Sequence, residues 1–513
     1  MTLILSISAT AAVLLTASAH AQPNRSTFRP EIPKTWEESE IESLQLPLAN
    51  PRYSPVPISA DYYYKLPVRP IYKSYAIYHP SKEPAGYMEW LKSLEPQIVS
   101  LDFASFRTRD DWIRAGEIVF DTPNDHDITA NARQFGDPAY YQRIGLTLAK
   151  DGTVPYTRYV IRKKGKVEVG FLSCGMCHTR VMQDGTVVKG AQGNFPFDRS
   201  GGTEELPEPV AQQLTPLFRH LARMLYDVPW LDPPEASLRF ETMSVKEIFD
   251  RSRAIPPGVN ARHGTGFHSP AQIPDLIGVR ERRYLDKTGL VRHRGIADLM
   301  RYAAMNQPVD LFSRYGDFIP AGDDFRRLPE PGKGPPFPFA IGRYSDEQLY
   351  ALALYIYSLQ PPANPHKPDA RTNRGKRVFE RAGCGVCHTP PLYTNNKLTP
   401  AAGFTIPADH KAKFDILPVV VGTDSTLALR TRRGTGYYKI PSLLGIWRRT
   451  PIEHNGSIAT LEDWFDPVRL RHDYVPTGFI GYEVKTRAVR GHEFGLNLSS
   501  EDKVALIAFL RTL

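Results

Sequence analysis

Two segments far apart in the chain carry the periodic apolar side chains of an amphipathic helix. In residues 345–359, apolar side chains recur at intervals of three and four, so they share one face of a helix. These side chains are Leu349, Leu352, Ile356 and Leu359. In residues 499–513, a similar apolar run follows Ser499 and Asp502, which together form a helix-capping pattern. The periodicity predicts a mainly α-helical fold.

From about residue 106 onward the chain repeats itself. Three pairs of segments match, in the same order in each half. The pairs are residues 116–120 with 375–379, residues 273–279 with 440–446, and residues 345–359 with 499–513. A C-x-x-C-H motif follows the first segment in each half, and chance explains four ordered landmarks poorly. We therefore predict two tandem domains, at residues 106–360 and 369–513, which open on helices at residues 112–120 and 374–381.

The segments outside the repeat read as irregular structure. Proline accounts for 46 of the 513 residues, well above the roughly 5 % of average usage. Residues 22–105 are rich in proline and tyrosine, and we predict an irregular extension that wraps over the first domain. The first domain also holds long insertions, including residues 191–262, and a proline-rich linker joins the domains at residues 361–368. We expect little sheet.

The C-x-x-C-H motifs predict two covalently bound c-type haems. The motifs are Cys174-Gly175-Met176-Cys177-His178 and Cys384-Gly385-Val386-Cys387-His388. Two thiols at this spacing add to the two vinyl groups of one porphyrin, and the adjacent histidine becomes a ligand of the iron. These are the only four cysteines of the chain. A thioredoxin-like pair would need a βαβ context that is not visible, and a four-cysteine zinc site would leave both histidines unexplained. A helix, a haem-binding turn and a closing helix together make a cytochrome c-like domain.

The N-terminus and the charge bear on location and partners. Residues 1–21 are apolar and end in Ala19-His20-Ala21, which predicts a cleaved signal peptide and a periplasmic or secreted protein. The segment lacks Lys and Arg, so an uncleaved anchor or an upstream start stays an alternative. No later stretch is apolar over the about 18 residues that a membrane span needs. The net charge of +9 comes without a lysine-rich run or a nucleic-acid motif. It favours a small acidic redox protein as partner.

The second haem needs a second axial ligand, which cytochrome c domains usually take from the loop before the closing helix. The last methionine of the chain is Met305, so the second domain has none. Its histidines beyond the motif are His410, His454, His472 and His492. His492 lies seven residues before Ser499, in the expected loop, and is our first choice; His472 is the second. We predict that His388 and His492 bind this iron.

The first haem has no such ligand in its own loop. The corresponding place is Pro338, and the whole window of residues 331–344 contains no His, Met or Cys. Lys333 and Tyr344 are remote alternatives. Histidines elsewhere in this domain could also approach, and these are His126, His220, His263, His268 and His293. We predict that His178 alone binds this iron, so that the opposite face can bind dioxygen or peroxide.

The run at residues 440–465, IPSLLGIWRRTPIEHNGSIATLEDWF, resembles the bacterial di-haem cytochrome c peroxidase superfamily, which includes the MauG-type enzymes and the rubber oxygenases. His454-Asn455-Gly456-Ser457 and Thr460-Leu461-Glu462 are the most similar parts. The resemblance covers roughly residues 106–513. The extension and the insertions are more like those of the rubber oxygenase branch. The resemblance implies an open N-terminal haem, a ligated C-terminal haem and His454 at a haem edge.

The resemblance also implies further site residues. The peroxidases carry a distal acid after an Asn-Pro pair, and the counterpart at residues 306–310 makes Asp310 the candidate acid for O–O cleavage. A surface aspartate at a helix end is the alternative. The peroxidases' tryptophan between the haems is absent here, so Tyr284 or Trp447 would replace it as an electron relay. The family often holds a calcium ion between its domains.

Three functions are consistent with the sequence. The first is a di-haem oxidoreductase that activates dioxygen or peroxide at the first haem and uses the second as an electron relay. The second is a cytochrome c peroxidase, which the missing methionine disfavours because methionine ligation raises a haem potential. The third is an electron carrier, which the ligand-free window disfavours. We favour the first, and by analogy with the rubber oxygenases its substrate would be apolar.

Overall fold

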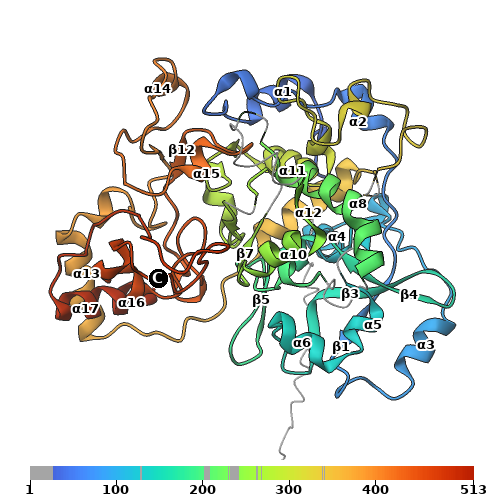
Figure 1. Cartoon of the computed structure of the whole chain (residues 1–513), viewed down its shortest axis with the longest axis horizontal. Helices are drawn as coiled ribbons and strands as arrows, with labels where there is room; N and C mark the ends of the chain where they lie inside the picture. The colour runs from blue at the N-terminus through green and yellow to red at the C-terminus, as the bar shows by residue number, and fades with distance from the viewer. Residues whose placement is uncertain are drawn as a thin grey trace, which may run out of the picture.

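The computed structural model describes residues 27–127, 130–201, 208–228, 230, 242–261, 264–266, 269–337, 339 and 341–513. The predicted signal peptide at residues 1–21 lies outside these ranges. Helices predominate and the sheets are small, as the apolar periodicity predicted (Figure 1). In the described ranges no helix is both long and apolar enough to cross a membrane.

The N-terminal half of the molecule, up to residue 358, is built around two crossing helices, α4 (Arg109–Asp121) and α12 (Asp346–Ser358). The first C-x-x-C-H motif begins with the short helix α7 (Cys174–Cys177). The other helices of this half are α1 (Glu38–Leu44), α2 (Ala60–Lys65), α3 (Tyr87–Ser93), α5 (Ala132–Phe135), α6 (Pro138–Ile144), α8 (Glu208–Tyr226), α10 (Val245–Arg253) and α11 (Ile296–Met305).

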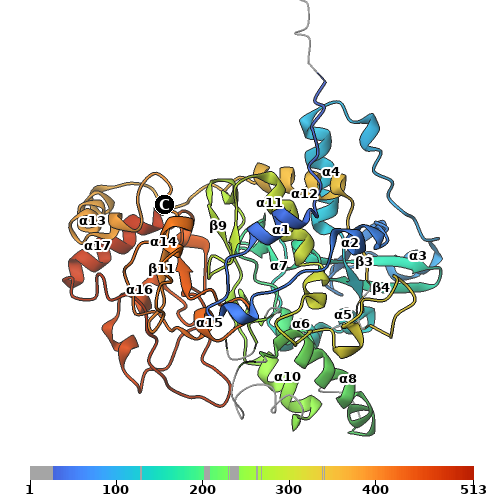
Figure 2. The ribbon, with the colours of Figure 1, turned by 90° about the horizontal axis from the view of Figure 1, so that it is seen from above.

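The C-terminal half, from residue 370 onward, repeats this plan with fewer elements and lies beside the N-terminal half (Figures 1 and 2). Its crossing helices are α13 (Ala370–Arg381) and α17 (Ser500–Arg511), and its motif begins with the 3-10 turn η8 (Cys384–Val386). The other elements are β11 (Leu398–Pro400), α14 (His410–Lys413), α15 (Thr426–Leu429), β12 (Tyr437–Lys439), η9 (Ile446–Arg448), α16 (Leu461–Trp464) and η10 (Pro467–Leu470).

The largest sheet combines one strand of the N-terminal extension with three strands that lie between α4 and the first motif. It has four antiparallel strands in the order β1-β3-β4-β2. The strands are β1 (Ser74–Tyr78), β2 (Asp125–His126), β3 (Thr153–Lys163) and β4 (Lys166–Phe171). Its apolar side chains pack with Met176, whose side chain is fully buried inside the first motif. The sheet therefore covers α7. In the part of the chain that the structure describes, η8 has no comparable sheet packed on it.

The two-stranded ribbons are β5 (Thr179–Val181) with β6 (Val187–Lys189), β7 (Val259–Asn260) with β8 (Ala271–Gln272), β9 (Tyr284–Leu285) with β10 (Val291–Arg292), and β11 with β12.

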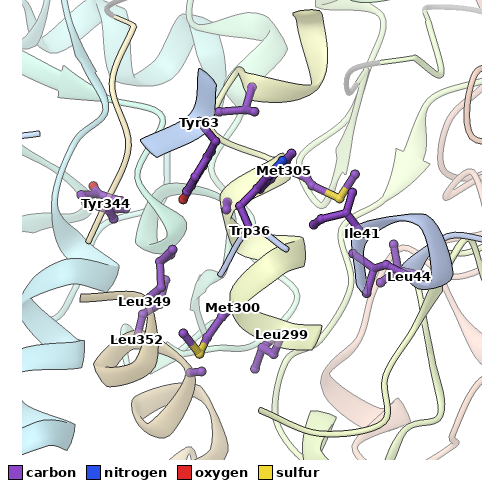
Figure 3. Close-up of a cluster of buried hydrophobic side chains, with 14 of the residues drawn as sticks. Trp36, Ile41, Leu44, Tyr63, Leu299, Met300, Met305, Tyr344, Leu349 and Leu352 are labelled. Atoms are coloured by element: carbon purple, nitrogen blue, oxygen red, sulfur yellow. The ribbon is translucent and has the colours of Figure 1, made fainter. Parts of the chain in front are cut away.

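The extension at residues 27–105 contributes to the core of the N-terminal half (Figure 3). Trp36 stacks on Tyr63 with ring centroids 4.6 Å apart, and its indole N–H donates to the carbonyl of Ile58 at 2.9 Å. Both rings are almost fully buried, in one cluster with Leu349 of α12 and Met300 of α11. Burial of aromatic side chains of this size is a large apolar contribution to stability. The extension is therefore a structural part of the half that holds the first motif.

The helix crossings of the two halves have the same close-contact geometry. A Cβ added to Gly116 of α4 would lie 2.0 Å from the carbonyl oxygen of Ala351 in α12. A Cβ added to Gly375 of α13 would lie 2.0 Å from the carbonyl oxygen of Ala505 in α17. Gly116 and Gly375 are the first residues of the matching segments of the repeat. Each glycine is required because only a residue without a side chain lets the two backbones approach this closely.

Gly116→Ala is accordingly expected to destabilise the protein by about 1–3 kcal/mol, the usual cost of overpacking a core. Denaturant unfolding of the full chain measures the change. The matched control is Gly295→Ala, because Gly295 has an extended backbone with φ 179° and no atom within 4 Å of an added Cβ. Equal stability of the two variants would contradict the role of the glycine at the crossing.

Candidate di-haem site

The four cysteines have the state that covalent haem attachment requires. None of the four forms a disulfide. Burial raises the pKa of Cys174 to about 12, the opposite of the lowered pKa that makes a thioredoxin-type cysteine reactive. Within the described ranges, no three side chains of His, Cys, Asp or Glu gather to hold a metal ion. Neither the redox pair nor the zinc site is therefore supported, and the calcium ion implied by the resemblance has no carboxylate cluster there.

Each motif histidine is oriented by a backbone carbonyl of its own half. His178 donates from Nδ1 to the carbonyl of Pro274 at 3.0 Å, and His388 donates from Nδ1 to the carbonyl of Pro441 at 3.1 Å. In a neutral imidazole, this bond makes Nε2 the nitrogen that can bind a metal. Pro274 and Pro441 belong to the matching segments 273–279 and 440–446. The sequence revealed the repeat, but not that this segment orients the iron ligand. The donor set therefore fits a haem c in each half.

Replacement of one motif's cysteines should remove one haem. Cys384→Ala with Cys387→Ala is expected to leave one covalent haem per chain, because the thioether bonds of the other motif are unaffected. The pyridine haemochrome assay measures the haem content, and the matched control is Cys174→Ala with Cys177→Ala. Two haems in either double variant would refute the assignment of the motifs.

His492 is half-buried near His388, and its position is fixed by its neighbours. Its Nδ1 atom is buried and has no hydrogen-bond partner among the described residues. Burial, followed by the nearby His388, lowers the pKa of His492 to about 4. The fully buried Arg469 donates to the carbonyl of His492 at 2.8 Å, and Trp464 packs edge-on against its ring. A Cβ on Gly491 would lie 2.6 Å from Trp464, so the chain can pass this ring only at a glycine.

The other histidines of the C-terminal half have different surroundings. His472, our second choice, is exposed. His410 is buried and its Nδ1 contacts the hydroxyl of Tyr437 at 2.9 Å. His454 contacts Glu453 through Nδ1, and its ring packs on Tyr438. The structure thus offers stronger geometric support for His492 than for His472.

The place that corresponds to His492 in the N-terminal half is apolar. Pro338 itself lies outside the described residues, but its neighbours Phe337 and Phe339 are both described, with ring centroids 6.0 Å apart. Phe337 also packs on Phe312 and Phe325, at 5.0 and 5.5 Å. Phenylalanine offers no donor to iron. The loop before α12 therefore carries a cluster of aromatic rings where the loop before α17 carries a histidine.

The two remote ligand alternatives in this loop are engaged elsewhere. Tyr344 is buried, and its hydroxyl donates to Oδ1 of Asn124 at 2.9 Å. Burial raises the pKa of Tyr344, which disfavours the phenolate that would bind iron. Lys333 forms an exposed ion pair with Glu330 at 2.7 Å. Neither side chain is presented as an iron ligand.

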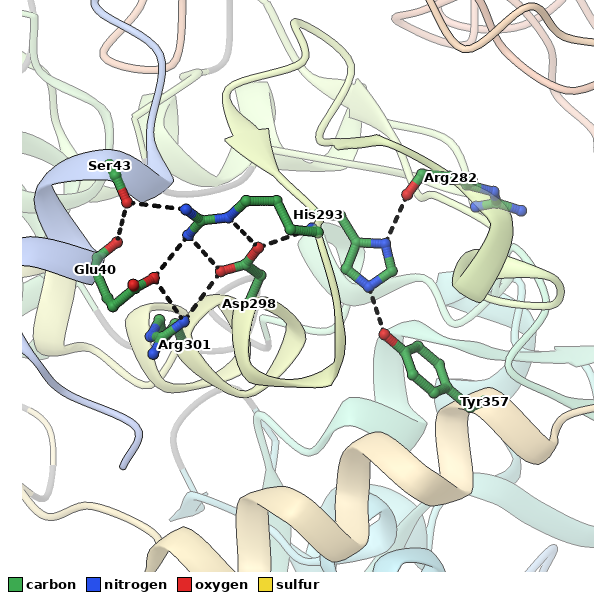
Figure 4. Close-up of polar contacts among 8 residues, drawn as sticks. Glu40, Ser43, Arg282, His293, Asp298, Arg301 and Tyr357 are labelled. Atoms are coloured by element: carbon green, nitrogen blue, oxygen red, sulfur yellow. Dashed lines mark hydrogen bonds and ion pairs between the residues drawn. The ribbon is translucent and has the colours of Figure 1, made fainter. Parts of the chain in front are cut away.

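His293, an alternative from outside the loop, has both ring nitrogens in hydrogen bonds (Figure 4). Nδ1 donates to the carbonyl of Arg282 at 2.6 Å, and Nε2 accepts from the hydroxyl of Tyr357 at 2.6 Å. The neighbouring Arg294 and Asp298 pair at 2.8 Å and connect α11 to α1 (Figure 4). Iron binding by His293 would therefore require breaking an ordered network.

The remaining histidines of this half are spread over separate elements. His126 lies in β2, with its ring edge-on to Tyr72, and burial lowers its pKa to about 4. His220 lies in α8, and its Cε1 approaches the Gly322 turn. His263 and His268 are outside the described residues. None of the described histidines of this half occupies a position equivalent to that of His492.

Asp310 and Tyr284, both predicted as site residues, line two different cavities. Asp310 forms an ion pair with Arg433 at 3.5 Å, in a cavity also lined by Arg432 and Tyr302. Tyr284 lines a second cavity together with Pro274 and Pro441, the prolines whose carbonyls accept from the motif histidines. The structure does not bring Asp310 and Tyr284 together.

Of the two candidate relays, only Tyr284 lines the cavity that Pro274 and Pro441 also line. It is nearly fully buried, and its hydroxyl is 3.3 Å from Oδ2 of Asp415. Trp447 is half-buried in η9, and its ring packs edge-on against His366 of the linker. Tyr284 is therefore better positioned than Trp447 for an electron relay.

The segment after the first motif forms much of the contact between the two halves. Arg180, two residues beyond His178, donates to the carbonyl of Thr450 at 3.0 Å and to its hydroxyl at 2.8 Å. Gln192 and Gln272 both donate to the carbonyl of Pro451, at 3.0 and 2.7 Å. The run that carries the family resemblance is thus bound to the chain that leaves the first motif.

The two motifs differ in exposure. Gly175 and Met176 of the first motif are buried. Val386, which corresponds to Met176 in the second motif, is 67 % exposed, and η8 has no buried residue. The second motif therefore faces solvent, while the first is enclosed by the sheet and the extension.

Comparison with known proteins finds only distant structural likeness. No protein family matches the sequence, and no curated protein matches it. A chain of "Kuenenia stuttgartiensis Hydrazine Synthase Pressurized with 20 bar Xenon" aligns with 60 % of this chain and 88 % of its own length, at 14 % identity and a TM-score of 0.29. A "MauG-like protein associated with microbial copper homeostasis" aligns with 33 % of this chain and 56 % of its own length, at 18 % identity and a TM-score of 0.22. Both likenesses are too distant to assign a family.

Proposed function

We propose that this protein is a periplasmic or secreted di-haem c-type oxidoreductase. In this proposal the haem at His178 activates dioxygen or peroxide, and the haem at His388 is an electron relay. The observation that carries the proposal is the asymmetry between the two loops before the closing helices. One loop places the half-buried His492 near His388, and the other carries Phe337 and Phe339.

The side chains of the chain have distinct tasks in this proposal. A bound haem supplies an iron that exchanges electrons and, where one face is open, binds a small oxidant. The carbonyls of Pro274 and Pro441 accept hydrogen bonds from Nδ1 of the motif histidines and so hold each Nε2 in position. Arg469 and Trp464 hold His492, so that the C-terminal site is closed to oxidants. The aromatic rings of the loop before α12 offer no iron ligand and would suit an apolar organic substrate.

The different exposure of the two motifs supports the proposed roles, oxidant activation at the first haem and electron relay at the second. Electron exchange with a small redox protein needs a short path to the surface, which the exposed Val386 loop offers. Oxidant chemistry benefits from a site closed to bulk water, which the sheet and the extension favour at the first motif. Tyr284, in the cavity lined by Pro274 and Pro441, is the proposed relay residue.

A cytochrome c peroxidase is the second candidate, and Asp310 tests it. The ion pair with Arg433 suits a structural carboxylate, so Asp310→Asn is expected to keep peroxide turnover within tenfold of wild type. Loss of a general acid typically costs 10²–10⁴-fold. Steady-state turnover with peroxide measures the effect, with the exposed Asp317→Asn as the matched control. A loss of 10²-fold or more with carbon monoxide binding intact would assign the acid to Asp310 and favour the peroxidase.

A further inference from the structure

We propose that four half-buried cations around one cavity, Arg282, Lys287, Lys439 and Arg449, bind propionate carboxylates of both haems. This set is called the cation cluster below. The inference rests on the proposed attachment of a haem to each motif. It adds a cofactor-binding site that joins the two haems through one set of side chains.

The cation cluster lines a cavity of about 40 Å³. The cavity is also lined by Pro274 and Pro441, the residues whose carbonyls orient His178 and His388. Arg282 and Lys287 come from the N-terminal half, and Lys439 and Arg449 from the C-terminal half. The cavity is therefore built by both halves, and one proline in its lining contacts each motif histidine.

The cluster has little negative charge of its own. The one carboxylate that lines the cavity is Asp275, and it is already bound by Arg448, at 2.8 Å, outside the cluster. Lys287 donates to the neutral side chain of Gln272, and Lys439 is 3.4 Å from the carbonyl of Tyr284. The two arginines likewise donate to backbone carbonyls, those of Asp275, Ile277 and Ser442.

Buried charges of one sign are costly unless an anion neutralises them. Burial, reinforced by the neighbouring arginine Arg449, lowers the pKa of Lys287 to about 7. Burial also lowers the pKa of Lys439, with further lowering by Arg282 and Lys287. The pKa of Arg449 falls to about 10 for the same reasons. Such an arrangement is unfavourable by itself and becomes favourable when anions enter the cavity.

Haem propionates are the anions that fit this place. Each haem carries two carboxylates, and the residues that orient the two motif histidines, Pro274 and Pro441, line this same cavity, so the cation cluster would be available to hold them. The volume suits a few carboxylate oxygens or one or two waters, whose share of liquid volume is about 30 Å³ each. A divalent cation, such as the calcium ion that the resemblance implies, has the wrong sign for this cavity.

The cation cluster is expected to change the reduction potential of the haem iron. A positive charge near a haem disfavours the ferric state, which carries one more positive charge than the ferrous state, so it raises the reduction potential. Removal of one cation should therefore lower the potential of every haem whose propionate it binds. A cluster shared by both haems predicts that a single substitution changes both potentials.

The test is a spectroelectrochemical titration of the full-length protein, after its haem content has been measured. Lys439→Met and Lys287→Met are expected to keep two haems and to shift the ferric–ferrous equilibrium of both at least tenfold towards ferric. Tenfold corresponds to about 59 mV for a one-electron couple. Lys411→Met, an exposed lysine of α14, is the matched control and should change neither potential.

Unchanged potentials in variants that retain both haems would overturn the proposal. Potentials that respond to added phosphate in the wild type would also overturn it, because a diffusible anion would then occupy the cluster. A wild-type protein without covalent haem would instead refute the proposed function itself.

If the lysine variants fold poorly, a measurement on the wild-type protein still tests the proposal. Redox-difference infrared spectra with haem labelled by ¹³C at the propionates should show ionised carboxylate bands for both haems, because each lies against a cation. Protonated propionate bands would contradict the cluster.

Discussion

His178→Gly is expected to remove the wild-type carbon monoxide spectrum of the reduced protein, and oxidant-dependent activity with it. In the wild type, reduction followed by carbon monoxide should change the spectrum of one haem per chain. We assign that haem to His178, because the loop before α12 carries Phe337 and Phe339 where a ligand would otherwise lie. Without His178, the iron of the first haem loses its one proposed protein ligand.

The matched control is His388→Gly, at the equivalent position of the other motif. This variant should retain carbon monoxide binding at the first haem, because Pro274 still orients His178. Titration of the reduced variants with carbon monoxide measures the stoichiometry. Binding by His178→Gly with wild-type stoichiometry and spectrum would assign the open site to the wrong haem.

His492→Gly should have the opposite effect and create a second open site. Carbon monoxide binding should rise from one to two per chain, and the low-spin signal of the second haem should become high-spin. The reason is the position of His492, which is half-buried near His388 with no hydrogen-bond partner for Nδ1 among the described residues. No methionine follows Met305, so the second domain has no methionine that could replace His492 as the iron ligand.

His472→Gly is the control for this substitution, because His472 is exposed and lies in the same half. It should leave one carbon monoxide site and the low-spin signal intact. A high-spin conversion by His472→Gly, with none by His492→Gly, would exchange the roles of the two histidines.

The sequence predicted the elements that local pattern and repetition determine. The crossing helices followed from apolar periodicity, and Gly116 and Gly375 appeared at matching places because both crossings need the same close approach. The hairpin of β3 and β4 was not predicted, although Lys164-Gly165 separates two segments rich in β-branched residues. The high proline content favoured irregular structure there, but tertiary packing against Met176 stabilises a sheet.

The parts of the site that the sequence did not reveal depend on long-range contacts. The matching Ile-Pro segments were found, but their carbonyls meet the motif histidines 53 and 96 residues away in the chain. Lys287 and Lys439 are far apart in sequence, so only folding shows that they line one cavity. The pairing of Asp310 with Arg433 joins the two halves and could not be read from the Asn-Pro pattern.

An electron paramagnetic resonance spectrum of the oxidised full-length protein tests the central claim most directly. The claim is that one iron has a single histidine ligand and the other has two. The account predicts one high-spin and one low-spin ferric haem per chain when the signals are integrated. Two low-spin haems, with no high-spin signal, would contradict it and identify the protein as an electron carrier.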